Sequence, residues 1–252
     1  MDYIRMACCF DMEHMGGFAV SNVCYIFDLD GTLTPSRQPI TVQFGKFFSK
    51  FAENNETYIV TGSDYPKVVE RLGTEICEKI KRIYCCSGND VWENGVNIRK
   101  NSWNPDADLR KYLDDWLHAS KYPVRTGNHL EMRSGSVNFS IVGRNADNKQ
   151  RKEYAKWDHN TKERDSIAFN INRLFHDVVA VCGGETGIDI FPKGNDKSQI
   201  LKDFAKDQTI WFYGDKTKPG GNDYAIANVL KHPHRVFAVD SWHDTHALLK
   251  NI

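Results

Sequence analysis

An alternation of apolar strands and helical segments occupies both ends of this 252-residue chain and is interrupted in its middle. Residues 23–27 form an unbroken apolar run, which is typical of a strand buried on both faces of a parallel sheet. Apolar residues at helical spacing follow over 41–54, and a helix that starts at 63–66 separates further apolar runs at 58–60 and 82–86. This order of strand, helix, strand, helix and strand predicts a right-handed parallel α/β sheet.

The middle of the chain carries a different pattern. Asn94-Gly95 is the strongest short signal for a hairpin, and residues 130–141 indicate two antiparallel strands about a turn at 134–136. Helices are expected over 106–119 and 149–175, the second with a break near 158–161. Hairpins and helices without regular alternation predict an α+β unit.

The parallel pattern returns near the end of the chain, with apolar runs at 209–213 and 235–238 and helical segments beside them. One α/β core is therefore interrupted by a second domain. We predict a core domain over residues 22–95 and 193–252, an inserted α+β cap domain over 96–192, and a mobile amino-terminal extension over 1–21.

The charge and cysteine content restrict the class of protein. The 33 basic and 33 acidic residues cancel, which argues against broad electrostatic binding of nucleic acid or of an anionic membrane. No apolar run approaches the roughly 20 residues that span a bilayer. The seven cysteines show no metal-binding spacing, and the first residues lack the pattern of a secretory signal. We expect a reduced, cytoplasmic protein without nucleic-acid or membrane partners.

Acidic residues follow two of the predicted strands. Asp28 and Asp30 come directly after the first strand, and Asp215 and Asn222-Asp223 come after the strand at 209–213. Because α/β proteins bind ligands at the carboxyl ends of parallel strands, we expect these side chains to converge. Carboxylates held close together require a cation, and hard oxygen ligands suit Mg²⁺.

Three further residues complete this set. Thr61 and Ser63 end the second strand and offer donors for a phosphoryl group, and Lys197 opens a helix and can supply a fixed positive charge. Each feature alone is more often a turn or a helix cap. It is the ordered set, spread over most of the chain, that indicates phosphoryl-transfer chemistry.

With these motifs the chain resembles the haloacid dehalogenase superfamily of phosphoryl-transfer enzymes and, within it, the eukaryotic-type phosphomannomutases. The resemblance covers about residues 22–252 and implies an α/β fold, a Rossmann-like parallel-sheet haloacid dehalogenase core with an inserted α+β cap domain. The longest matching strings are Phe27-Asp28-Leu29-Asp30-Gly31-Thr32-Leu33-Thr34, Gly62-Ser63-Asp64, Gly143-Arg144, Phe191-Pro192, Asp196-Lys197 and Gly214-Asp215-Lys216-Thr217, with Pro219-Gly220-Gly221-Asn222-Asp223 behind them.

The resemblance implies roles for residues of the core. Asp28 is the implied nucleophile and Asp30 the implied general acid/base, while Lys197 offsets charge on the transferring group. Magnesium is implied to bind Asp28, the backbone carbonyl of Asp30 and Asp215, helped by Asn222 or Asp223.

Further implied roles lie mainly in the cap. Arg133, Arg144 and Arg151, with Arg37 from the core, are implied to hold the distal phosphate of the substrate, for which the planar guanidinium is well suited. Asp189 is implied to bind sugar hydroxyls with help from Asn138, and Ser63 to bind the phosphoryl group.

The implied reaction interconverts mannose 6-phosphate and mannose 1-phosphate through an aspartyl-phosphate and a hexose 1,6-bisphosphate. Glucose or mannose 1,6-bisphosphate would act as activator, the product would supply GDP-mannose synthesis, and the partners would be hexose phosphates and a second copy bound through the cap.

Departures from the family pattern keep two alternatives open. Gly187 stands where the family has a serine that touches substrate, and Gly88-Asn89-Asp90 replaces Glu-Asn-Gly. Thr61 replaces a glycine and is the residue that related sugar phosphatases carry, which favours a Mg²⁺-dependent sugar-phosphate phosphatase. A non-catalytic sugar-phosphate sensor is the other alternative, and the presence of all the core acidic residues argues against it.

Overall fold

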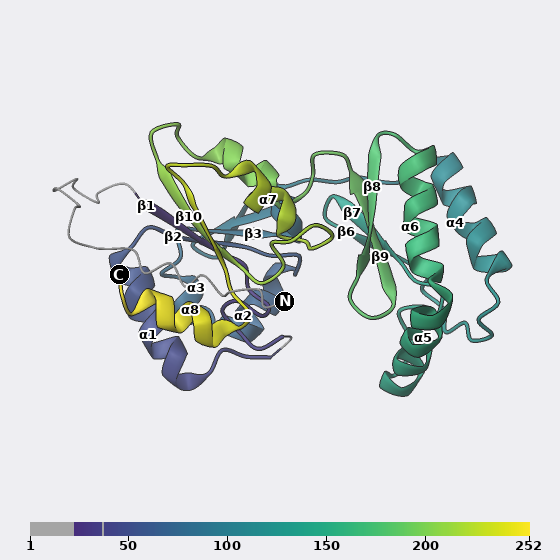
Figure 1. Cartoon of the computed structure of the whole chain (residues 1–252), viewed down its shortest axis with the longest axis horizontal. Helices are drawn as coiled ribbons and strands as arrows, with labels where there is room; N and C mark the ends of the chain where they lie inside the picture. Colours follow the sequence, from purple (N-terminus) through teal and green to yellow (C-terminus); the bar gives the residue numbers. More distant parts are fainter. Residues whose placement is uncertain (1–22, 37) are drawn as a thin grey trace, which may run out of the picture.

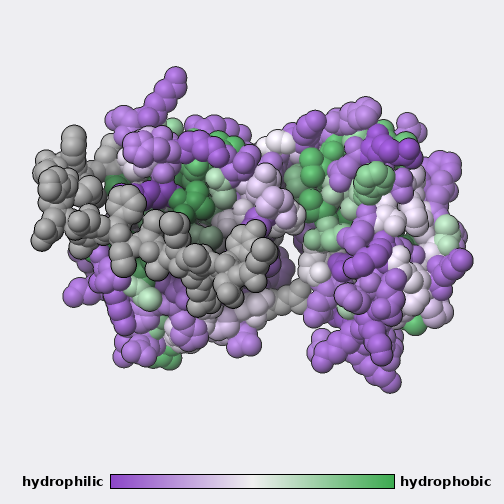
Figure 2. All heavy atoms as spheres, in the orientation of Figure 1, coloured by the Kyte–Doolittle hydropathy of each residue, from purple (hydrophilic) through white to green (hydrophobic). Residues whose placement is uncertain are grey.

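The computed structural model describes residues 23–36 and 38–252, so the predicted extension over 1–21 lies outside the described residues. Two bodies lie side by side, and the chain crosses between them twice (Figure 1). The space-filling view shows hydrophilic residues over much of the outer surface of both bodies and a hollow between them on this face (Figure 2). No helix in the described part of the chain is long and apolar enough to cross a membrane.

The core body is built on a seven-stranded sheet with the order β11-β10-β1-β2-β3-β4-β5. Strands β11, β10, β1, β2 and β3 pair in parallel, whereas β4 and β5 add an antiparallel hairpin at one edge. This parallel sheet is the fold predicted from the strand–helix alternation. The strands are β1 (Val23–Phe27), β2 (Thr57–Val60), β3 (Arg82–Cys85), β4 (Asp90–Glu93), β5 (Val96–Lys100), β10 (Thr209–Gly214) and β11 (Arg235–Ala238).

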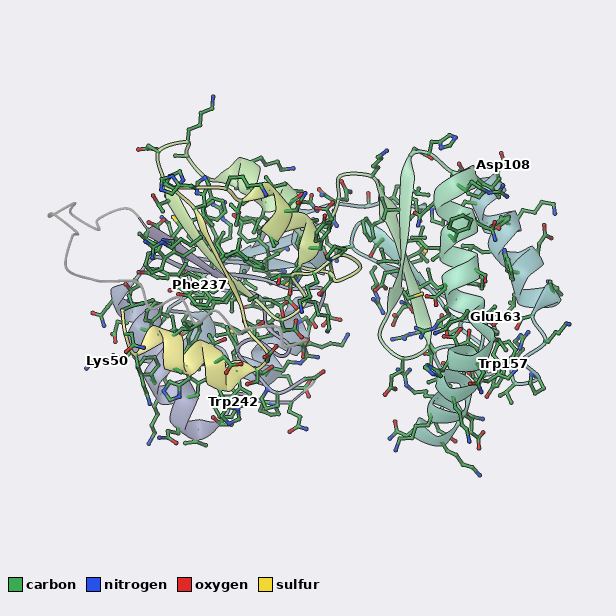
Figure 3. All side chains as sticks on the ribbon, viewed as in Figure 1. Lys50, Asp108, Trp157, Glu163, Phe237 and Trp242 are labelled. Atoms are coloured by element: carbon green, nitrogen blue, oxygen red, sulfur yellow. The ribbon has the colours of Figure 1, made fainter. Side chains whose placement is uncertain are left out.

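Helices cover both faces of this sheet because β1 is apolar on both faces. Tyr25 and Phe27 pack into one apolar cluster and Cys24 and Ile26 into another. The first face is covered mainly by α1 and α8. Trp242 of α8, labelled in Figure 3, stacks on Phe44 of α1 with ring centroids 5.7 Å apart. The helices are α1 (Val42–Asn54), α2 (Tyr65–Leu72), α3 (Thr74–Cys77) and α8 (Trp242–Leu249) on that side, and α7 (Tyr224–Val229) with the 3-10 helix η3 (Lys197–Asp203) on the other.

The cap body is a four-stranded antiparallel sheet with the order β6-β7-β9-β8, covered on one face by three helices. Val137, Phe139, Ile188 and Ile190 point into the apolar cluster beneath these helices. Residues that alternate with them along the strands belong to the opposite face, which is the face toward the core (Figure 1). The elements are α4 (Ala107–Ala119), β6 (Leu130–Arg133), β7 (Ser136–Phe139), α5 (Asn148–Thr161), α6 (Glu163–Leu174), β8 (Val178–Gly183) and β9 (Gly187–Pro192).

The predicted hairpin at Asn94-Gly95 is confirmed, and it moves the start of the insert. Both turn residues have positive φ, 48° and 74°, as the favoured two-residue turns require. The turn leads β5 back along β4, so residues 96–100, which the sequence assigned to the cap, complete the sheet of the core. We therefore propose that the cap begins after Lys100 and ends near Pro192.

Two helices differ in detail from their predictions. The helical region at 149–175 breaks at Lys162, which has φ 55° in the left-handed region, and not over residues 158–161. The helix expected from Lys197 is the 3-10 helix η3. In both cases local backbone geometry, and not the apolar pattern, decides the result.

Candidate active site

Three carboxylates from distant parts of the core meet at the carboxyl end of the parallel sheet. Asp28 follows β1, Asp215 follows β10, and Asp223 precedes α7. Strands β1 and β10 are neighbours with Phe27 opposite Tyr213, so the residues after them emerge side by side. One ligand oxygen of each of the three carboxylates lies within 4.8 Å of the others.

Lys197 lies inside this acidic cluster. Its side chain is 1% exposed, and its Nζ donates to Asp28 and, at 2.6 Å, to Asp223. Burial alone would lower the pKa of Lys197, but the two carboxylates, Asp223 first, raise it above its ordinary value. The lysine is therefore a fixed cation beneath the site.

The charges of the cluster fit a divalent cation. Burial, reinforced by Asp223 and Asp215 and opposed by Lys197, raises the pKa of Asp28 to about 7. Burial also raises the pKa of Asp215, whose Oδ1 is buried with no hydrogen-bond partner among the described residues. One lysine does not balance three carboxylates, and an oxygen-rich group with an unpartnered acceptor suits Mg²⁺.

Gly31 shows why the loop after β1 needs a glycine. Its φ is 86°, and a Cβ there would lie 2.5 Å from Oδ2 of Asp215. The loop therefore packs against the carboxylate that comes from β10. The other predicted ligand beside the cluster, Asn222, is exposed, whereas Asp223 is fully buried.

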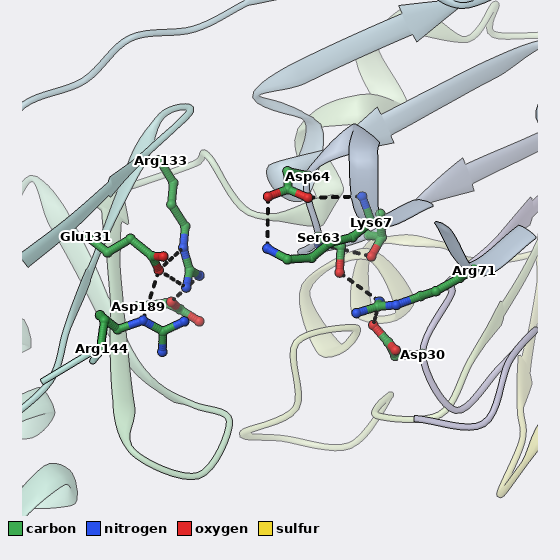
Figure 4. Close-up of polar contacts among 10 residues, drawn as sticks. Asp30, Ser63, Asp64, Lys67, Arg71, Glu131, Arg133, Arg144 and Asp189 are labelled. Carbon is green, nitrogen blue, oxygen red and sulfur yellow. Dashed lines mark hydrogen bonds and ion pairs between the residues drawn. The ribbon is translucent and has the colours of Figure 1, made fainter. Parts of the chain in front are cut away.

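Asp30 forms a second group with residues from the next βα unit. Its carboxylate forms an ion pair with Arg71 of α2, and Nη1 of Arg71 also donates to Ser63 Oγ at 2.9 Å (Figure 4). Helix α2 starts as predicted, with Asp64 as its N-cap. Thr61 is buried and its hydroxyl accepts from the backbone N–H of Ser63 at 3.1 Å, which fixes the loop before the helix.

The cap presents a polar row to the core. Glu131, Asn138 and Asp189 are direct neighbours across β6, β7 and β9. Arg133 donates to Glu131 through Nε at 2.9 Å and to Asp189 through Nη1 at 3.1 Å. Asn138 donates to Asp189 at 2.6 Å. The row is therefore one connected network of charges (Figure 4).

Two more arginines lie beside this network and line the same cavity. Nε of Arg144 lies 3.2 Å from Glu131, and Arg151 on α5 lies 3.6 Å from Glu185. Burial lowers the pKa of Arg144, although arginine stays protonated at neutral pH. Arg133, Arg144 and Arg151, which the sequence placed together, thus lie together on the cap. Arg37, the fourth predicted arginine, lies outside the described residues.

A cavity of about 1100 Å³ separates the two polar groups. Asp30, Ser63 and Arg71 line its core side, and the cap row lines the other side. Asp28 is only 3% exposed and does not line the cavity, whereas Asp30, two residues further along the chain, does. The cavity is of the size of a small-molecule site, and its walls can grip an anion from two sides.

Comparison with known proteins identifies the family. The sequence profile described as "Eukaryotic phosphomannomutase" matches residues 44–252. The chain belongs to the eukaryotic phosphomannomutase family. It is 32% identical over 221 residues to phosphomannomutase 1 of Dictyostelium discoideum, covering 83% of this chain and 88% of the relative. It is 30% identical over 244 residues to phosphomannomutase 2 of the same organism, covering 91% and 96%.

Solved structures support the fold. A haloacid dehalogenase-like hydrolase from Bacteroides thetaiotaomicron matches 91% of this chain and 99% of its own length, with a TM-score of 0.57 and 12% identity. At that identity the match concerns the fold alone. The Rossmann-like core with an inserted cap that the sequence predicted is confirmed.

One departure from the phosphomannomutase family pattern has a structural counterpart. A Cβ at Gly187 would lie 2.5 Å from the side-chain nitrogen of Asn138. The Asn138 amide therefore occupies the space next to residue 187, and its Oδ1 is buried with no hydrogen-bond partner among the described residues.

Sequence reasoning missed Arg71, although a signal was present. Lys67 and Arg71 are four residues apart, which places them on one face of the helix that begins just after Ser63. The role of Glu131 as the common partner of Arg133 and Arg144 was also missed. That role depends on cross-strand register, which the sequence does not display.

Proposed function

We propose that the protein is a Mg²⁺-dependent mutase that interconverts mannose 6-phosphate and mannose 1-phosphate. One observation carries the proposal. Asp30, which comes two residues after the buried Asp28 of the Lys197 ion pair, and a row of arginines on the cap line opposite sides of the same cavity. A mutase needs this arrangement, because each phosphate of a hexose bisphosphate must be held while the other one reacts.

On the core side, Asp28 is the proposed nucleophile. Its carboxylate oxygen attacks phosphorus to form an acyl phosphate, and the departing sugar oxygen takes a proton from Asp30. The phosphoryl group of this first attack comes from a hexose 1,6-bisphosphate, so a hexose monophosphate is left. In the second half, the free hydroxyl of a bound hexose monophosphate gives its proton to Asp30 and attacks the aspartyl-phosphate, which forms the bisphosphate again. Phosphate is thus moved between O1 and O6 through a hexose 1,6-bisphosphate, which turns end for end.

The positive charges of the core side assist this transfer. Lys197 is positioned to offset charge on Asp28 and on the transferring group. Magnesium, held by Asp28, the carbonyl of Asp30 and Asp215 with Asp223 or Asn222, would supply further positive charge to the phosphoryl oxygens. Ser63 is the proposed hydroxyl donor to the phosphate.

On the cap side, Arg133, Arg144 and Arg151 are the proposed grip for the phosphate that is not reacting, with Arg37 from the core. Asp189 and Asn138 are the proposed partners of sugar hydroxyls. Closure of the cap over the core would exclude water, which otherwise hydrolyses the acyl phosphate.

Several finer points belong to the same proposal. We propose glucose or mannose 1,6-bisphosphate as the activator that first phosphorylates Asp28, supply of GDP-mannose synthesis as the fate of the product, and a homodimer through the cap. A cytoplasmic location is supported by the thiols, because the five cysteines in the described residues are all free.

A sugar-phosphate phosphatase is the second candidate. Its support is Thr61, which is buried behind Ser63 at the position where the sequence departs toward the phosphatase pattern. In that case water, and not a sugar hydroxyl, would attack the aspartyl-phosphate.

A paired assay distinguishes the two candidates. Protein with Mg²⁺ receives mannose 1-phosphate and a trace of glucose 1,6-bisphosphate, and mannose 6-phosphate and free phosphate are followed together, with Asp28→Asn as control. Bisphosphate-dependent formation of mannose 6-phosphate with little free phosphate supports the mutase. Steady release of phosphate without isomerised product would select the phosphatase and reject the mutase.

A further inference from the structure

Arg71 is a buried arginine to which the proposed phosphoryl transfer gives no role. It lies in the last turn of α2 and is 9% exposed, so its stem is enclosed by the core. Its guanidinium nevertheless lines the cavity, where Nη1 meets both Asp30 and the Ser63 hydroxyl. The guanidinium therefore connects Asp30, the proposed acid/base residue, to Ser63, the proposed hydrogen-bond donor to the phosphate.

The other cations near this side of the cavity are less suited to meet a phosphate. Lys197 is occupied by Asp28 and Asp223 and is 1% exposed. Lys67 is 52% exposed and pairs with Asp64 at 2.8 Å, while Lys100 is exposed at the start of the linker to the cap. Arg71 is thus the buried cation adjacent to Ser63 among the described residues that line the cavity.

Arg71 can bind a phosphate and keep its ion pair with Asp30. Both of its contacts use Nη1. A guanidinium carries several N–H donors in one plane, in a fork that matches phosphate oxygens. A phosphate that accepts a hydrogen bond from Ser63 would therefore also lie within reach of the remaining donors of Arg71.

We propose that Arg71 binds the hexose phosphate group that is held on the core side of the cavity, next to Ser63. This inference rests on the proposed function, in which a phosphate must lie between Asp28 and the sugar. It deepens that function by naming the residue that holds the phosphate on the core side. With arginines at both walls, Arg71 on the core and the arginines of the cap opposite, the cavity is built for a sugar bisphosphate in preference to a monophosphate (Figure 4).

The consequence concerns the intermediate. After the second half-reaction the bisphosphate has no covalent bond to the protein, and only non-covalent contacts keep it in the cavity while it turns. Arg71 would hold whichever phosphate faces the core in either orientation. Loss of Arg71 is therefore expected to increase escape of the bisphosphate.

The test is a binding measurement on protein that cannot turn over. In the Asp28→Asn background with Mg²⁺, calorimetry gives the Kd of glucose 1,6-bisphosphate and of mannose 1-phosphate, with and without Arg71→Met. We expect Arg71→Met to weaken bisphosphate binding about 10- to 100-fold, the range of one charge-assisted hydrogen bond. Arg71→Lys should lose less, because it keeps the charge but not the fork.

Controls separate binding from folding. Arg110→Met removes an exposed arginine of α4 and should leave both Kd values unchanged. If Arg71→Met does not fold, as a thermal melt would reveal, then Arg71→Gln, which keeps a donor toward Ser63, replaces it in the same comparison. An unchanged bisphosphate Kd in a folded Arg71 variant overturns the proposal and leaves Arg71 as a support for Asp30.

Failure of this inference differs from failure of the proposed function. If wild-type protein forms mannose 6-phosphate but folded Arg71 variants bind the bisphosphate as before, the role of Arg71 is wrong and the mutase stands. If bisphosphate binding depends on Arg71 but wild-type protein only releases phosphate, the mutase is wrong and the role of Arg71 stands.

Discussion

The core and the cap each hold a group of acidic and basic side chains, and the two groups lie in opposite surroundings. On the core side, the side chains of Lys197, Asp28 and Asp223 are 1%, 4% and 0% exposed. On the cap side, the side chains of Arg133 and Asp189 are 27% and 33% exposed. The core cluster is enclosed, and the cap network is open to water.

This difference separates chemistry from recognition. Breaking a buried ion pair leaves an uncompensated charge and costs several kcal/mol, so the core cluster stays fixed. A partly exposed pair contributes only about 0–1 kcal/mol, so a cap arginine can exchange a carboxylate for a substrate phosphate at little cost. The fixed core cluster suits the proposed reacting group, and the exchangeable cap network suits the proposed grip on the phosphate that is not reacting.

The largest expected effect is loss of the proposed nucleophile. Asp28→Asn should lower turnover by at least ~10⁴-fold, because no acyl phosphate can form. The rate of mannose 1-phosphate conversion measures this effect, and a melt confirms folding. Turnover at the wild-type rate would remove Asp28 from the mechanism.

The next effect directly tests the difference in burial between the core cluster and the cap network. Lys197→Met should lower the free energy of unfolding by about 3–5 kcal/mol, since Asp28 and Asp223 lose their buried partner. Arg144→Met in the cap network should cost about 1 kcal/mol or less. Urea unfolding in metal-free buffer compares the two, and equal losses would show that burial does not distinguish the core cluster from the cap network.

Magnesium should stabilise the folded protein through the core carboxylate cluster, and this stabilisation should depend on pH. At about 100 times its Kd, a bound ion adds roughly 2.7 kcal/mol to the free energy of unfolding. Asp28 has its pKa raised to about 7, above that of the unfolded chain, so without metal its contribution to stability falls as pH rises from about 4 to 7. The cation needs the ionised carboxylate, and the rise in Tm caused by Mg²⁺ should therefore grow between pH 5 and 7 and then level off.

Asp215→Asn provides the matched control for this measurement. It removes one carboxylate of the group and should reduce the Mg²⁺-induced rise in Tm at every pH. A rise in Tm that is independent of both pH and Asp215 would place the ion elsewhere.

The smallest expected effect is on kcat/KM and comes from the cap network. Arg144→Gln should lower kcat/KM for mannose 1-phosphate about 10- to 100-fold, because one charge-assisted contact to phosphate is lost. Phosphorylation of Asp28 by acetyl phosphate, which has no distal phosphate, should be unchanged. Equal loss with both donors would mean that Arg144 supports the core chemistry and does not select the sugar phosphate.

The sequence predicted the features that follow from strand direction. Asp28 and Asp215 converge because parallel strands end at the same edge, and α2 starts where Asp64 and Pro66 indicate. The confirmed fold class followed from the alternation of strands and helices. These features depend on local pattern and on one rule of topology.

What the sequence did not reveal depends on side-chain direction and register. Arg71 lies 41 residues from Asp30, and only the packing of α2 against the sheet brings the two together. Glu131 joins two arginines because β6 and β7 pair in one particular register. The edge strand β5 joins the core because the hairpin turn directs it there.

Because the cap interrupts the core, the residues that surround Asp28 are synthesised at widely different times. Lys197 follows Asp28 by 169 residues, and β10, the strand beside β1, follows later still. At about 5–20 residues per second, a ribosome needs on the order of ten to thirty seconds to supply that lysine after Asp28. The chain of the cap, which is contiguous, is complete before then. On a growing chain the cap network can therefore form first, and Asp28 acquires its partners only near the end of synthesis.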